Sequence, residues 1–490
     1  MAKLVVFGYN ECAMILDQGG THMRDSFVGR TAELARCRNM ASSGKFECLV
    51  LYGRRRVGKT FLMLELLKEH DGLYFAFEQQ SAKVLLEKFS EQVLHRFPSA
   101  YLTTFASFEQ AFLYLADQVG NKPFILALDE FQYIAMQDKG FLSMLQNIID
   151  HHWLKTNLFL ILCGSYMSFM EIEVLGAQSP VFGRRTAAIK LEPLRFAEAR
   201  MMLHGYSNLE AFIAWGIVGG MPLYLKQFST DVDIRQNILE NILAKGSLLN
   251  NEPVFALKQE LREPSLYFSI LEGISTGKTK YNELTGLIGA DAGYYLNNLI
   301  ALGIVVREMP FGEKDNARKG VYRLRDPYFT FYFRYISRHL SLVEAEKHAL
   351  LWEQVIEPSL SDYLGQRFEA LCGEQLDDWN GTATLPFVFT GKGRWWGTNP
   401  ATRMQEEMDW VASDGANKVL IAECKWRTTP ATDKDVQKIL DRRALMPQSE
   451  AHLMLFTRKK LSTKATRLAQ AHHIIRMTFV EKGDILWNRE

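Results

Sequence analysis

The feature that most constrains this chain is a loop of eight residues, GRRRVGKT, at positions 53–60. It follows an apolar, strand-like run at 48–52 and precedes a helical run at 61–68. A glycine-rich loop between a strand and a helix N-terminus turns several backbone N–H groups toward one phosphate, and the helix dipole adds favourable charge. The loop therefore predicts that the chain binds ATP or ADP together with Mg²⁺. The residues predicted to contact the nucleotide here are Gly53, Arg56, Val57, Gly58, Lys59, Thr60 and Phe61.

The residue types in this loop suggest a separate role for each residue in nucleotide binding. Gly53 and Gly58 allow the backbone to wrap closely around the phosphates. Lys59 reaches the outer phosphates, and Thr60 supplies a hydroxyl group to Mg²⁺. Lys59 is therefore predicted to act in catalysis as well as in binding.

Short apolar runs alternate with helical stretches over the first 200 residues. These runs lie at 48–52, 73–77, 124–128, 158–163 and 187–191. Apart from Lys190 in the last run, they are apolar throughout rather than at every second position, which is typical of strands buried on both faces of a parallel sheet. An α/β domain, with helices covering a parallel sheet, is therefore predicted for residues 26–200.

Polar residues at the ends of these runs predict the rest of the ATPase site. Asp129 and Glu130 follow the run at 124–128, in the Walker B arrangement. Asp129 is expected to hold Mg²⁺ and Glu130 to polarise the attacking water. Ser165 ends the run that begins at 158 and is placed to sense the γ-phosphate, and Arg184 is a candidate for a transition-state cation.

Four segments resemble the archaeal-type ATPase family, which belongs to the signalling (STAND) branch of AAA+-like P-loop ATPases. They are FVGR at 27–30, the P-loop at 53–60, LDEFQ at 128–132 and GGMPL at 219–223. The resemblance covers roughly residues 26–345. It implies that Val28, Gly29 and Pro222 lie near the adenine base, with a helical lid closing over the nucleotide and a winged helix after it.

Residues 201–260 read as the helical lid, and 261–345 as a winged helix with a linker helix. Within the second segment, helical patterns at 266–274, 281–288 and 291–302 precede strand-like runs at 304–308 and 321–324, with a polar tip at 312–316. That order of elements is typical of a winged helix. The third helix carries no Arg or Lys through 294–298, which disfavours direct readout of DNA bases.

A second candidate site lies near the C-terminal end of the chain. The strand-like segments 408–413 and 419–426 flank a turn at 414–417. A turn centred near 416 places Asp409 opposite Glu423, about 5 Å apart at Cβ, so that the two carboxylates could hold one divalent metal ion. Lys425 shares a strand face with Glu423 and is expected to assist catalysis beside the metal.

This pattern resembles the PD-(D/E)xK nuclease superfamily. Glu369, on an upstream helix, would complete the acidic cluster, and Gln437 matches a position that some branches of the superfamily use. The sequence departs from the superfamily pattern because Met408, rather than proline, precedes Asp409. The resemblance implies an α+β restriction-endonuclease-like domain over 346–490.

Positive and negative charges nearly balance over the whole chain, but one segment has an excess of positive charge. The formal net charge is +1, which lacks the strong basic field of an obvious nucleic-acid-binding protein. From 425 to 467, however, there are 11 Lys or Arg and 4 Asp or Glu, a net of 11 − 4 = +7. This segment favours DNA as a partner of the C-terminal domain.

Two alternatives remain beside an ATPase coupled to a DNA nuclease. One is a signalling ATPase whose inactive nuclease fold binds a partner, and the other is a regulator that binds DNA through the winged helix. No apolar run approaches the roughly 18–20 residues that span a bilayer, and a cytoplasmic protein is expected. Residues 1–25 are expected to be an N-terminal extension, and assembly into a homo-oligomer is left open.

Overall fold

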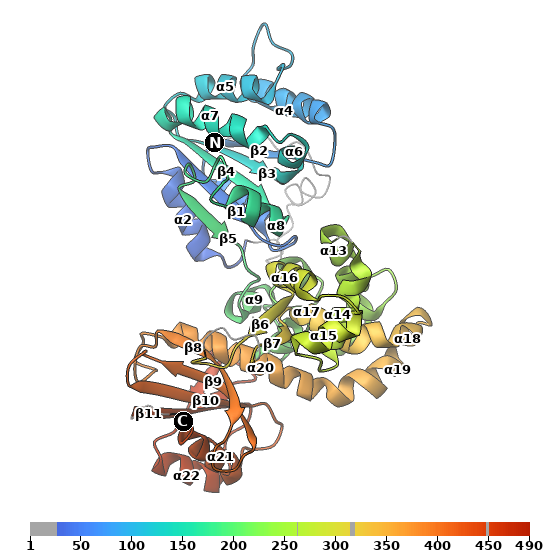
Figure 1. Ribbon diagram of the computed structural model, residues 1–490, viewed down its shortest axis with the longest axis vertical. Helices are drawn as coiled ribbons and strands as arrows, with labels where there is room; N and C mark the ends of the chain where they lie inside the picture. Colours follow the sequence, from blue (N-terminus) through green and yellow to red (C-terminus); the bar gives the residue numbers. More distant parts are fainter. Residues whose placement is uncertain (1–26, 262, 314–318, 447–449) are drawn as a thin grey trace. The chain divides into compact units, whose positions relative to one another are not determined.

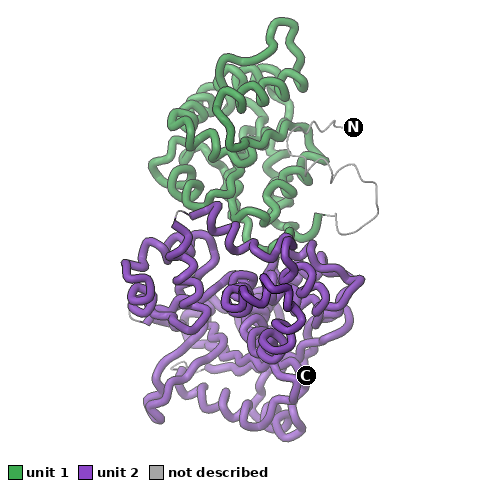
Figure 2. Tube along the Cα trace, turned by 90° about the vertical axis from the view of Figure 1, so that its right-hand side faces the viewer, with its two compact units in different colours: residues 1–194, 221–223 green, residues 195–220, 224–490 purple. Residues whose placement is uncertain are grey.

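The computed structural model describes residues 27–261, 263–313, 319–446 and 450–490, so the expected extension at 1–25 lies outside the described residues. The chain divides into two compact units (Figure 2). The first ends at Leu194 and also includes Met221–Leu223, and the second contains 195–220 and 224–490. The finer boundaries at 260 and 345 therefore fall within the second unit and stay predictions.

The first unit is an α/β domain built on a parallel sheet with strand order β2-β3-β4-β1-β5. Its strands are β1 (Glu47–Tyr52), β2 (Gly72–Ala76), β3 (Phe124–Asp129), β4 (Leu158–Gly164) and β5 (Ala187–Lys190). Its helices are α2 (Thr31–Ala41), α3 (Lys59–Leu67), α4 (Ala82–Arg96), α5 (Phe108–Val119), α6 (Gln132–Gln137), α7 (Phe141–His151), η2 (Trp153–Lys155), α8 (Met167–Phe169) and η3 (Met170–Val174). The predicted parallel sheet is confirmed.

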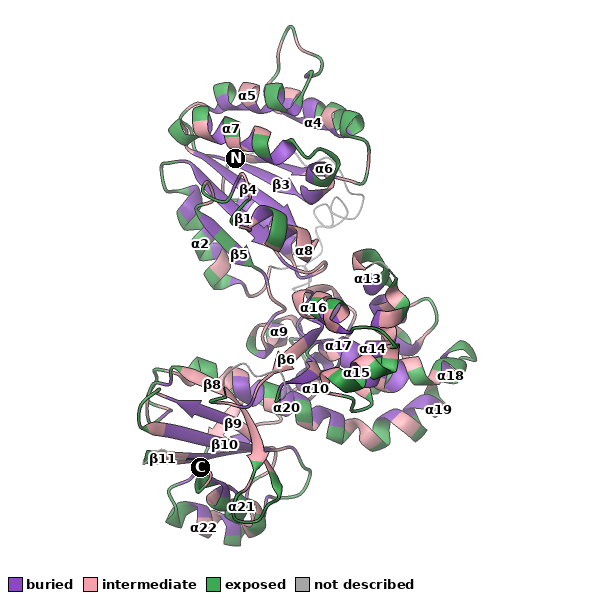
Figure 3. Cartoon of the chain, viewed as in Figure 1, coloured by how far each residue is buried: buried purple, intermediate pink, exposed green. Residues whose placement is uncertain are grey.

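Continuous burial explains why the central strands lack an alternating pattern, whereas the edge strand β5 alternates buried and exposed residues, contrary to the expectation for its run. Every residue of β3 and β4 is buried, and helices α4, α5 and α7 lie along one side of the sheet (Figures 1 and 3). Aromatic rings fill the layer between them; Phe112, for example, meets Trp153 edge-on with ring centroids 5.5 Å apart. This apolar core holds the carboxyl ends of the strands, which carry the predicted site, in fixed positions.

The second unit begins with helices and a small hairpin. These elements are α9 (Phe196–Met202), α10 (Asn208–Val218), α11 (Pro222–Leu225, which starts in the first unit), α12 (Ile234–Ile238), η4 (Leu239–Leu243), α13 (Glu252–Glu260), α14 (Pro264–Ser275), α15 (Tyr281–Ile288), α16 (Gly293–Ala301), β6 (Val305–Glu308) and β7 (Val321–Leu324). The predicted order of three helices and a hairpin is present from α14 to β7. Part of the predicted polar tip, 314–316, lies outside the described residues.

Helices then lead to a separate six-stranded sheet with order β13-β12-β11-β10-β9-β8. The helices are α17 (Pro327–Phe331), η5 (Tyr332–Ile336), η6 (Ser337–His339), α18 (Leu340–Glu344), α19 (His348–Leu351), η7 (Trp352–Ile356), α20 (Glu357–Trp379), α21 (Asp433–Arg443) and α22 (Thr463–Ala471). The strands are β8 (Gly391–Thr398), β9 (Gln405–Ser413), β10 (Lys418–Lys425), β11 (Glu450–Thr457), β12 (Ile475–Phe479) and β13 (Trp487–Arg489). Strands β8, β9 and β10 are antiparallel, whereas β10, β11 and β12 are parallel and are connected through α21 and α22.

Helix α10 packs directly on this C-terminal sheet domain. The ring of Phe212 lies 4.6 Å from that of Trp426, which directly follows β10, and 5.8 Å from that of Phe479. At the start of α10, the side-chain amide of Asn208 lies within 3.1 Å of three backbone carbonyls in the segment 480–485. Helix α10, which precedes Met221–Leu223 of the first unit in sequence, therefore belongs to the same compact unit as the C-terminal sheet.

Candidate functional site

The P-loop joins the end of β1 to the start of α3. Gly58 caps the helix with φ 99°, in the left-handed region that glycine adopts without strain. At Gly53 a Cβ atom would lie 2.5 Å from the backbone oxygen of Leu191, so no larger residue fits without a shift of backbone. Both glycines are therefore required by the geometry of the loop, as predicted from their spacing.

Lys59 is the first residue of α3 and is buried, with 5% of its surface exposed. Its ammonium group donates hydrogen bonds to the backbone oxygens of Gly53, at 2.9 Å, and Arg54, at 3.1 Å. The carbonyls of the loop thus satisfy this buried cation. An anionic phosphate in the loop would offer Lys59 stronger, charge-assisted hydrogen bonds in exchange for these neutral acceptors.

Thr60 and Asp129 meet beside the loop. The Thr60 hydroxyl donates to Oδ2 of Asp129 at 2.7 Å, and the Tyr74 hydroxyl donates to the same oxygen at 2.8 Å. Burial raises the pKa of Asp129, and the neighbouring carboxylate of Glu130 raises it further. A hydroxyl and a carboxylate are hard oxygen ligands, so this pair fits Mg²⁺, and the role predicted for both residues stays a prediction.

Glu130 has φ 50°, a left-handed conformation that is uncommon outside glycine and concentrated at functional sites. Its carboxylate accepts hydrogen bonds from the Ser165 hydroxyl, at 2.6 Å, and from the side-chain amide of Gln132. The structure thus brings Ser165 to Glu130. Gln132 was not predicted as a site residue, although its position within the LDEFQ motif, two residues after Glu130, was a signal for it.

The segment at 27–30 is tied to the P-loop by Arg30, whose guanidinium donates to the backbone oxygen of Val57 at 3.1 Å and also to that of Glu192. This contact keeps Val28 and Gly29, which precede Arg30, close to the loop. On the other side, the ring of Pro222 lies 3.8 Å from the point that a Cβ of Gly58 would occupy. Within this unit, Pro222 is therefore a neighbour of the P-loop.

Arg184 lies at the N-terminal ends of the strands, whereas the P-loop lies at their carboxyl ends. The P-loop follows Tyr52 at the end of β1, whereas the backbone N–H of Thr186 donates to Cys48 near the start of that strand. At this end of the strands, Arg184 pairs with both carboxylate oxygens of Asp150, at 3.0 and 2.7 Å. A six-residue strand is about 20 Å long, so the structure does not bring Arg184 to the P-loop of its own chain.

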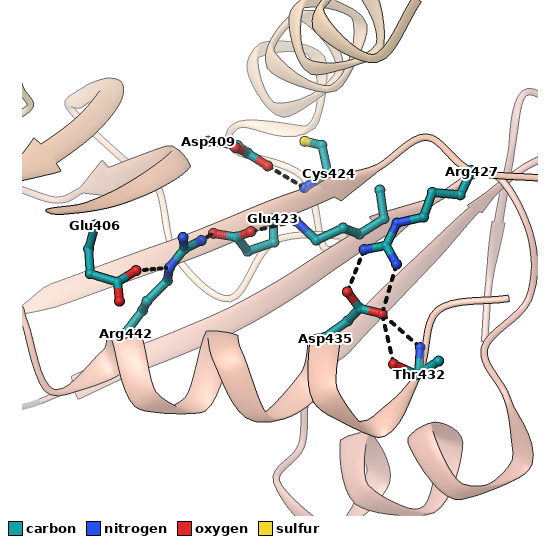
Figure 4. Close-up of polar contacts among 9 residues, drawn as sticks. Glu406, Asp409, Glu423, Cys424, Arg427, Thr432, Asp435 and Arg442 are labelled. Carbon is teal, nitrogen blue, oxygen red and sulfur yellow. Dashed lines mark hydrogen bonds and ion pairs between the residues drawn. The ribbon is translucent and has the colours of Figure 1, made fainter. Parts of the chain in front are cut away.

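The C-terminal candidate residues are brought together. The pairing of β9 with β10 runs from Val419 beside Ser413 to Ala422 beside Trp410, the register that places Asp409 next to Glu423. Oδ2 of Asp409 accepts a hydrogen bond of 2.7 Å from the backbone N–H of Cys424 (Figure 4). Lys425 donates to Glu423 at 2.7 Å.

Arg442 of α21 is a member of this site that the sequence did not reveal. Its guanidinium pairs with the second carboxylate oxygen of Glu423 and with Glu406 at 3.1 Å (Figure 4). Gln437, predicted for this helix, is exposed and bonds Asp441 at 2.9 Å instead. The helical partner of Glu423 is therefore an arginine, and no spacing rule in the sequence identifies it.

Glu369 of α20 forms an ion pair with Arg394 of β8 at 2.7 Å. Burial raises the pKa of Asp409 to about 7, and the negative charges of Glu423 and Glu369 add to the effect. Glu369 thus lies near Asp409, but its carboxylate is engaged elsewhere. Among the described residues, no group of three or more acidic, His or Cys side chains is arranged to hold a metal ion.

The metal fit of this site is therefore partial. Asp409 and Glu423 offer hard oxygen atoms of the kind that Mg²⁺ and Mn²⁺ prefer. Both oxygens of Glu423, however, face cations of the chain, Lys425 and Arg442. A divalent ion would have to displace at least one of these ion pairs.

Family comparisons give the ATPase unit a relationship to known proteins. Residues 27–228 match the family described as "ATPase domain predominantly from Archaea". Residues 332–439 match the family described as "Archaea bacterial proteins of unknown function". In the part of the chain that the structure describes, no helix has the length and apolar character needed to cross a membrane.

Similar proteins and structures include several from archaea. "Uncharacterized protein MJECL04" of Methanocaldococcus jannaschii is 31% identical over 417 residues, which cover 84% of this chain and 90% of that protein. The Walker-type ATPase of Pyrococcus abyssi has a TM-score of 0.49 at 20% identity, covering 66% of this chain and 100% of that one. A STAND protein with a tetratricopeptide repeat sensor from Pyrococcus horikoshii has a TM-score of 0.31 at 16% identity, covering 72% and 54%. The chain therefore belongs to one family with the M. jannaschii protein and carries an archaeal-type ATPase domain in residues 27–228.

Proposed function

We propose that this ATPase couples its nucleotide state to a metal-dependent, nuclease-like site on strands β9 and β10. The observation that carries the C-terminal part is the strand register that sets Asp409 beside Glu423, with Lys425 2.7 Å from the latter. The order of a helical Glu, a strand Asp and a strand Glu-x-Lys also supports the proposal through its resemblance to the PD-(D/E)xK superfamily.

In the ATPase unit, the P-loop amides and Lys59 would hold the phosphates, while Thr60 and Asp129 would hold Mg²⁺. The ion would neutralise charge between the phosphates. To reach the nucleotide, Lys59 leaves its two carbonyl partners. Glu130 orients the attacking water, and Ser165 holds the Glu130 carboxylate in place.

At the C-terminal site, Asp409 and Glu423 would hold the divalent ion, which activates water and stabilises charge in phosphodiester hydrolysis. Lys425 remains close enough to stabilise developing negative charge. Exposed cations of the basic segment 425–467 support a polyanionic substrate, and DNA fits this chemistry. They include Lys434, Lys438, Arg443, Lys460 and Arg467.

The packing of α10 on the C-terminal sheet domain supports coupling between the two activities. Val218 at the end of α10 is joined by two glycines to Met221, and Pro222 lies next to Gly58 of the P-loop. A shift of Pro222 on nucleotide binding therefore has a short covalent path to α10. The winged helix proposed for 261–345 offers a second route.

One observation favours a second candidate, a signalling ATPase with an inactive nuclease fold. Lys425 and Arg442 already neutralise Glu423 through two ion pairs. In that case the C-terminal domain binds a partner and does not cut. A DNA-binding regulator that uses the winged helix is less favoured, because the described helix α16 (GYYLNNLIA) carries no Arg or Lys.

Cleavage assays on the full chain separate these functions. Purified protein is incubated with single-stranded, duplex or branched DNA, with Mg²⁺ or Mn²⁺, and with or without ATP. Asp409→Ala, Glu423→Ala and Lys425→Ala should each abolish cleavage and leave ATP hydrolysis intact. Lys418→Ala, a half-buried lysine at the other end of β10, is the matched control. Cleavage that persists in the Asp409/Glu423 double variant would eliminate the nuclease proposal.

A further inference from the structure

Strand β9 contains an irregularity at the C-terminal site. Gly393 of β8 pairs with Val411, but Trp395 pairs with Met408, so the register shifts by one residue between them. Two residues of β9, Asp409 and Trp410, therefore stand opposite a single residue of β8, Arg394. Bulges of this kind redirect side chains and are common next to active sites.

The hairpin formed by β6 and β7 holds β8 at this point. Phe311, which follows β6, donates a backbone hydrogen bond of 2.7 Å to the carbonyl oxygen of Arg394. Its ring packs against β8 so closely that a Cβ on Gly393 would lie 3.3 Å from the ring. Phe311 also packs on the apolar core of the C-terminal sheet domain, a cluster that includes Met408. Phe311 therefore attaches the hairpin to β8 through both a backbone hydrogen bond and the packing of its ring.

The side chain of Arg394 connects this hairpin to the carboxylates. It pairs with Glu369 at 2.7 Å and with Glu407 at 2.9 Å, and Glu407 lies 3.5 Å from Arg323 of β7. Burial by itself would lower the pKa of Arg394, but the surrounding carboxylates, Glu369 first, raise it above its usual range. Arg394 therefore stays charged beside the site.

We propose that Arg394 is a positioning residue through which the β6–β7 hairpin controls the C-terminal site. While the hairpin is docked, Arg394 holds Glu369 in an ion pair and adds a positive charge beside Asp409. Release of the hairpin frees both Arg394 and Glu369, which makes the site more negative and more attractive to a divalent cation. This proposal rests on the proposed metal site and names its regulation.

The test measures Mn²⁺ affinity of the full, nucleotide-free chain by calorimetric titration, with Asp409→Ala subtracted to remove ions bound elsewhere. Arg394→Gln should bind Mn²⁺ at least about tenfold more tightly, because a buried cation near the site is lost. Phe311→Ala should shift affinity in the same direction. Combined with Arg394→Gln, it should add nothing further, since both changes act through one side chain.

Two further variants guard against general damage to the fold. Arg394→Lys keeps the charge but loses the two-pronged contact with Glu369 and Glu407, so its affinity should fall between wild type and Arg394→Gln. Arg403→Gln, an exposed arginine at the tip of the β8–β9 hairpin, should change nothing. Thermal unfolding of each variant checks that the C-terminal domain is folded, because ATP hydrolysis reports on the ATPase unit.

The outcomes separate the two proposals. If wild type binds Mn²⁺ through Asp409 but Arg394→Gln does not bind it more tightly, the positioning role is wrong and the metal site stands. Full additivity of Phe311→Ala and Arg394→Gln would also overturn the role of the hairpin. If no variant shows binding that depends on Asp409, the metal site itself is wrong, and the proposed control fails with it.

Discussion

Thr60 and Asp129, which lie 69 residues apart in sequence, share a hydrogen bond of 2.7 Å between Oγ1 and Oδ2. The bond ties the first turn of α3 to the end of β3. Both groups are hard oxygen ligands, and the bond holds them next to each other. Such preorganisation lowers the cost of assembling the site when ATP binds.

Lys59→Ala is expected to weaken ATP binding by about tenfold to a hundredfold, because a charge-assisted hydrogen bond to phosphate is worth roughly 1.5–3 kcal/mol. Titration with a fluorescent ATP analogue measures the loss, and circular dichroism checks the fold. Lys68→Ala, at the exposed end of the same helix, should bind as wild type does. Turnover close to wild type in Lys59→Ala would contradict the P-loop assignment.

Glu130→Gln should keep the nucleotide bound and slow hydrolysis by about 10²–10⁴, since only the group that acts on water changes. The amide still accepts the hydrogen bond from Ser165. Binding and turnover are measured separately, by equilibrium titration and by phosphate release. Loss of binding as large as in Lys59→Ala would show that the two residues do not divide their roles in this way.

Asp409→Asn should stabilise the protein at neutral pH. The pKa of Asp409 is raised to about 7, above the value of about 3.9 in an unfolded chain. The folded state therefore holds an extra proton between pH 4 and 7, and wild-type stability falls as pH rises through this window and then levels off. The variant should be more stable at pH 8 by about 2–4 kcal/mol.

Thermal unfolding of wild type and Asp409→Asn from pH 4 to 8 measures this effect. The difference between the two proteins should vanish near pH 4, where both carry a neutral side chain at this position. Saturating Mn²⁺ should reduce it at pH 8 by stabilising ionised Asp409. An equal difference at every pH would mean that the carboxyl group is not protonated in the folded state.

Arg442→Gln should lower stability and increase the response to metal. Removing one partner of a buried ion pair costs about 3–5 kcal/mol when the other charge is left uncompensated, and the remaining pair of Glu423 with Lys425 should keep the cost here at the low end of that range. The same change frees one oxygen of Glu423 for a divalent ion. The melting temperature is measured in EDTA and in excess Mn²⁺.

Mn²⁺ should raise the melting temperature of Arg442→Gln more than that of wild type, since a ligand stabilises the state that binds it. Arg443→Gln, a substitution at the exposed neighbour, serves as the control. A variant that is destabilised but gains no extra response to Mn²⁺ would show that Arg442 supports the fold without competing with metal.

Local sequence patterns were enough to predict much of this fold. Continuous apolar runs identified the parallel sheet, and the period of two in β-strands was enough to place Asp409 beside Glu423. The candidate ligands of these sites could therefore be predicted from spacing along single strands and loops.

Such patterns could not predict residues that reach a site from an element distant in sequence. Arg442 and Arg394 depend on how α21 and β8 pack against their neighbours, and the bulge at Asp409 has no signature in a single sequence. Arg184 was a candidate for a cation that acts on the nucleotide. Its position at the N-terminal ends of the strands, away from the P-loop, depends on β5 running parallel to β1. Tertiary packing decides these positions.

The packing of α10 has a consequence for the synthesis of the chain. Phe212 is fully buried, yet its partners Trp426 and Phe479 leave the ribosome long after α10 does. At about 5–20 residues per second, the apolar face of α10 stays uncovered for roughly ten to fifty seconds. The C-terminal domain is thus a folding partner of this helix, and a nascent chain arrested before β10 is expected to recruit chaperones.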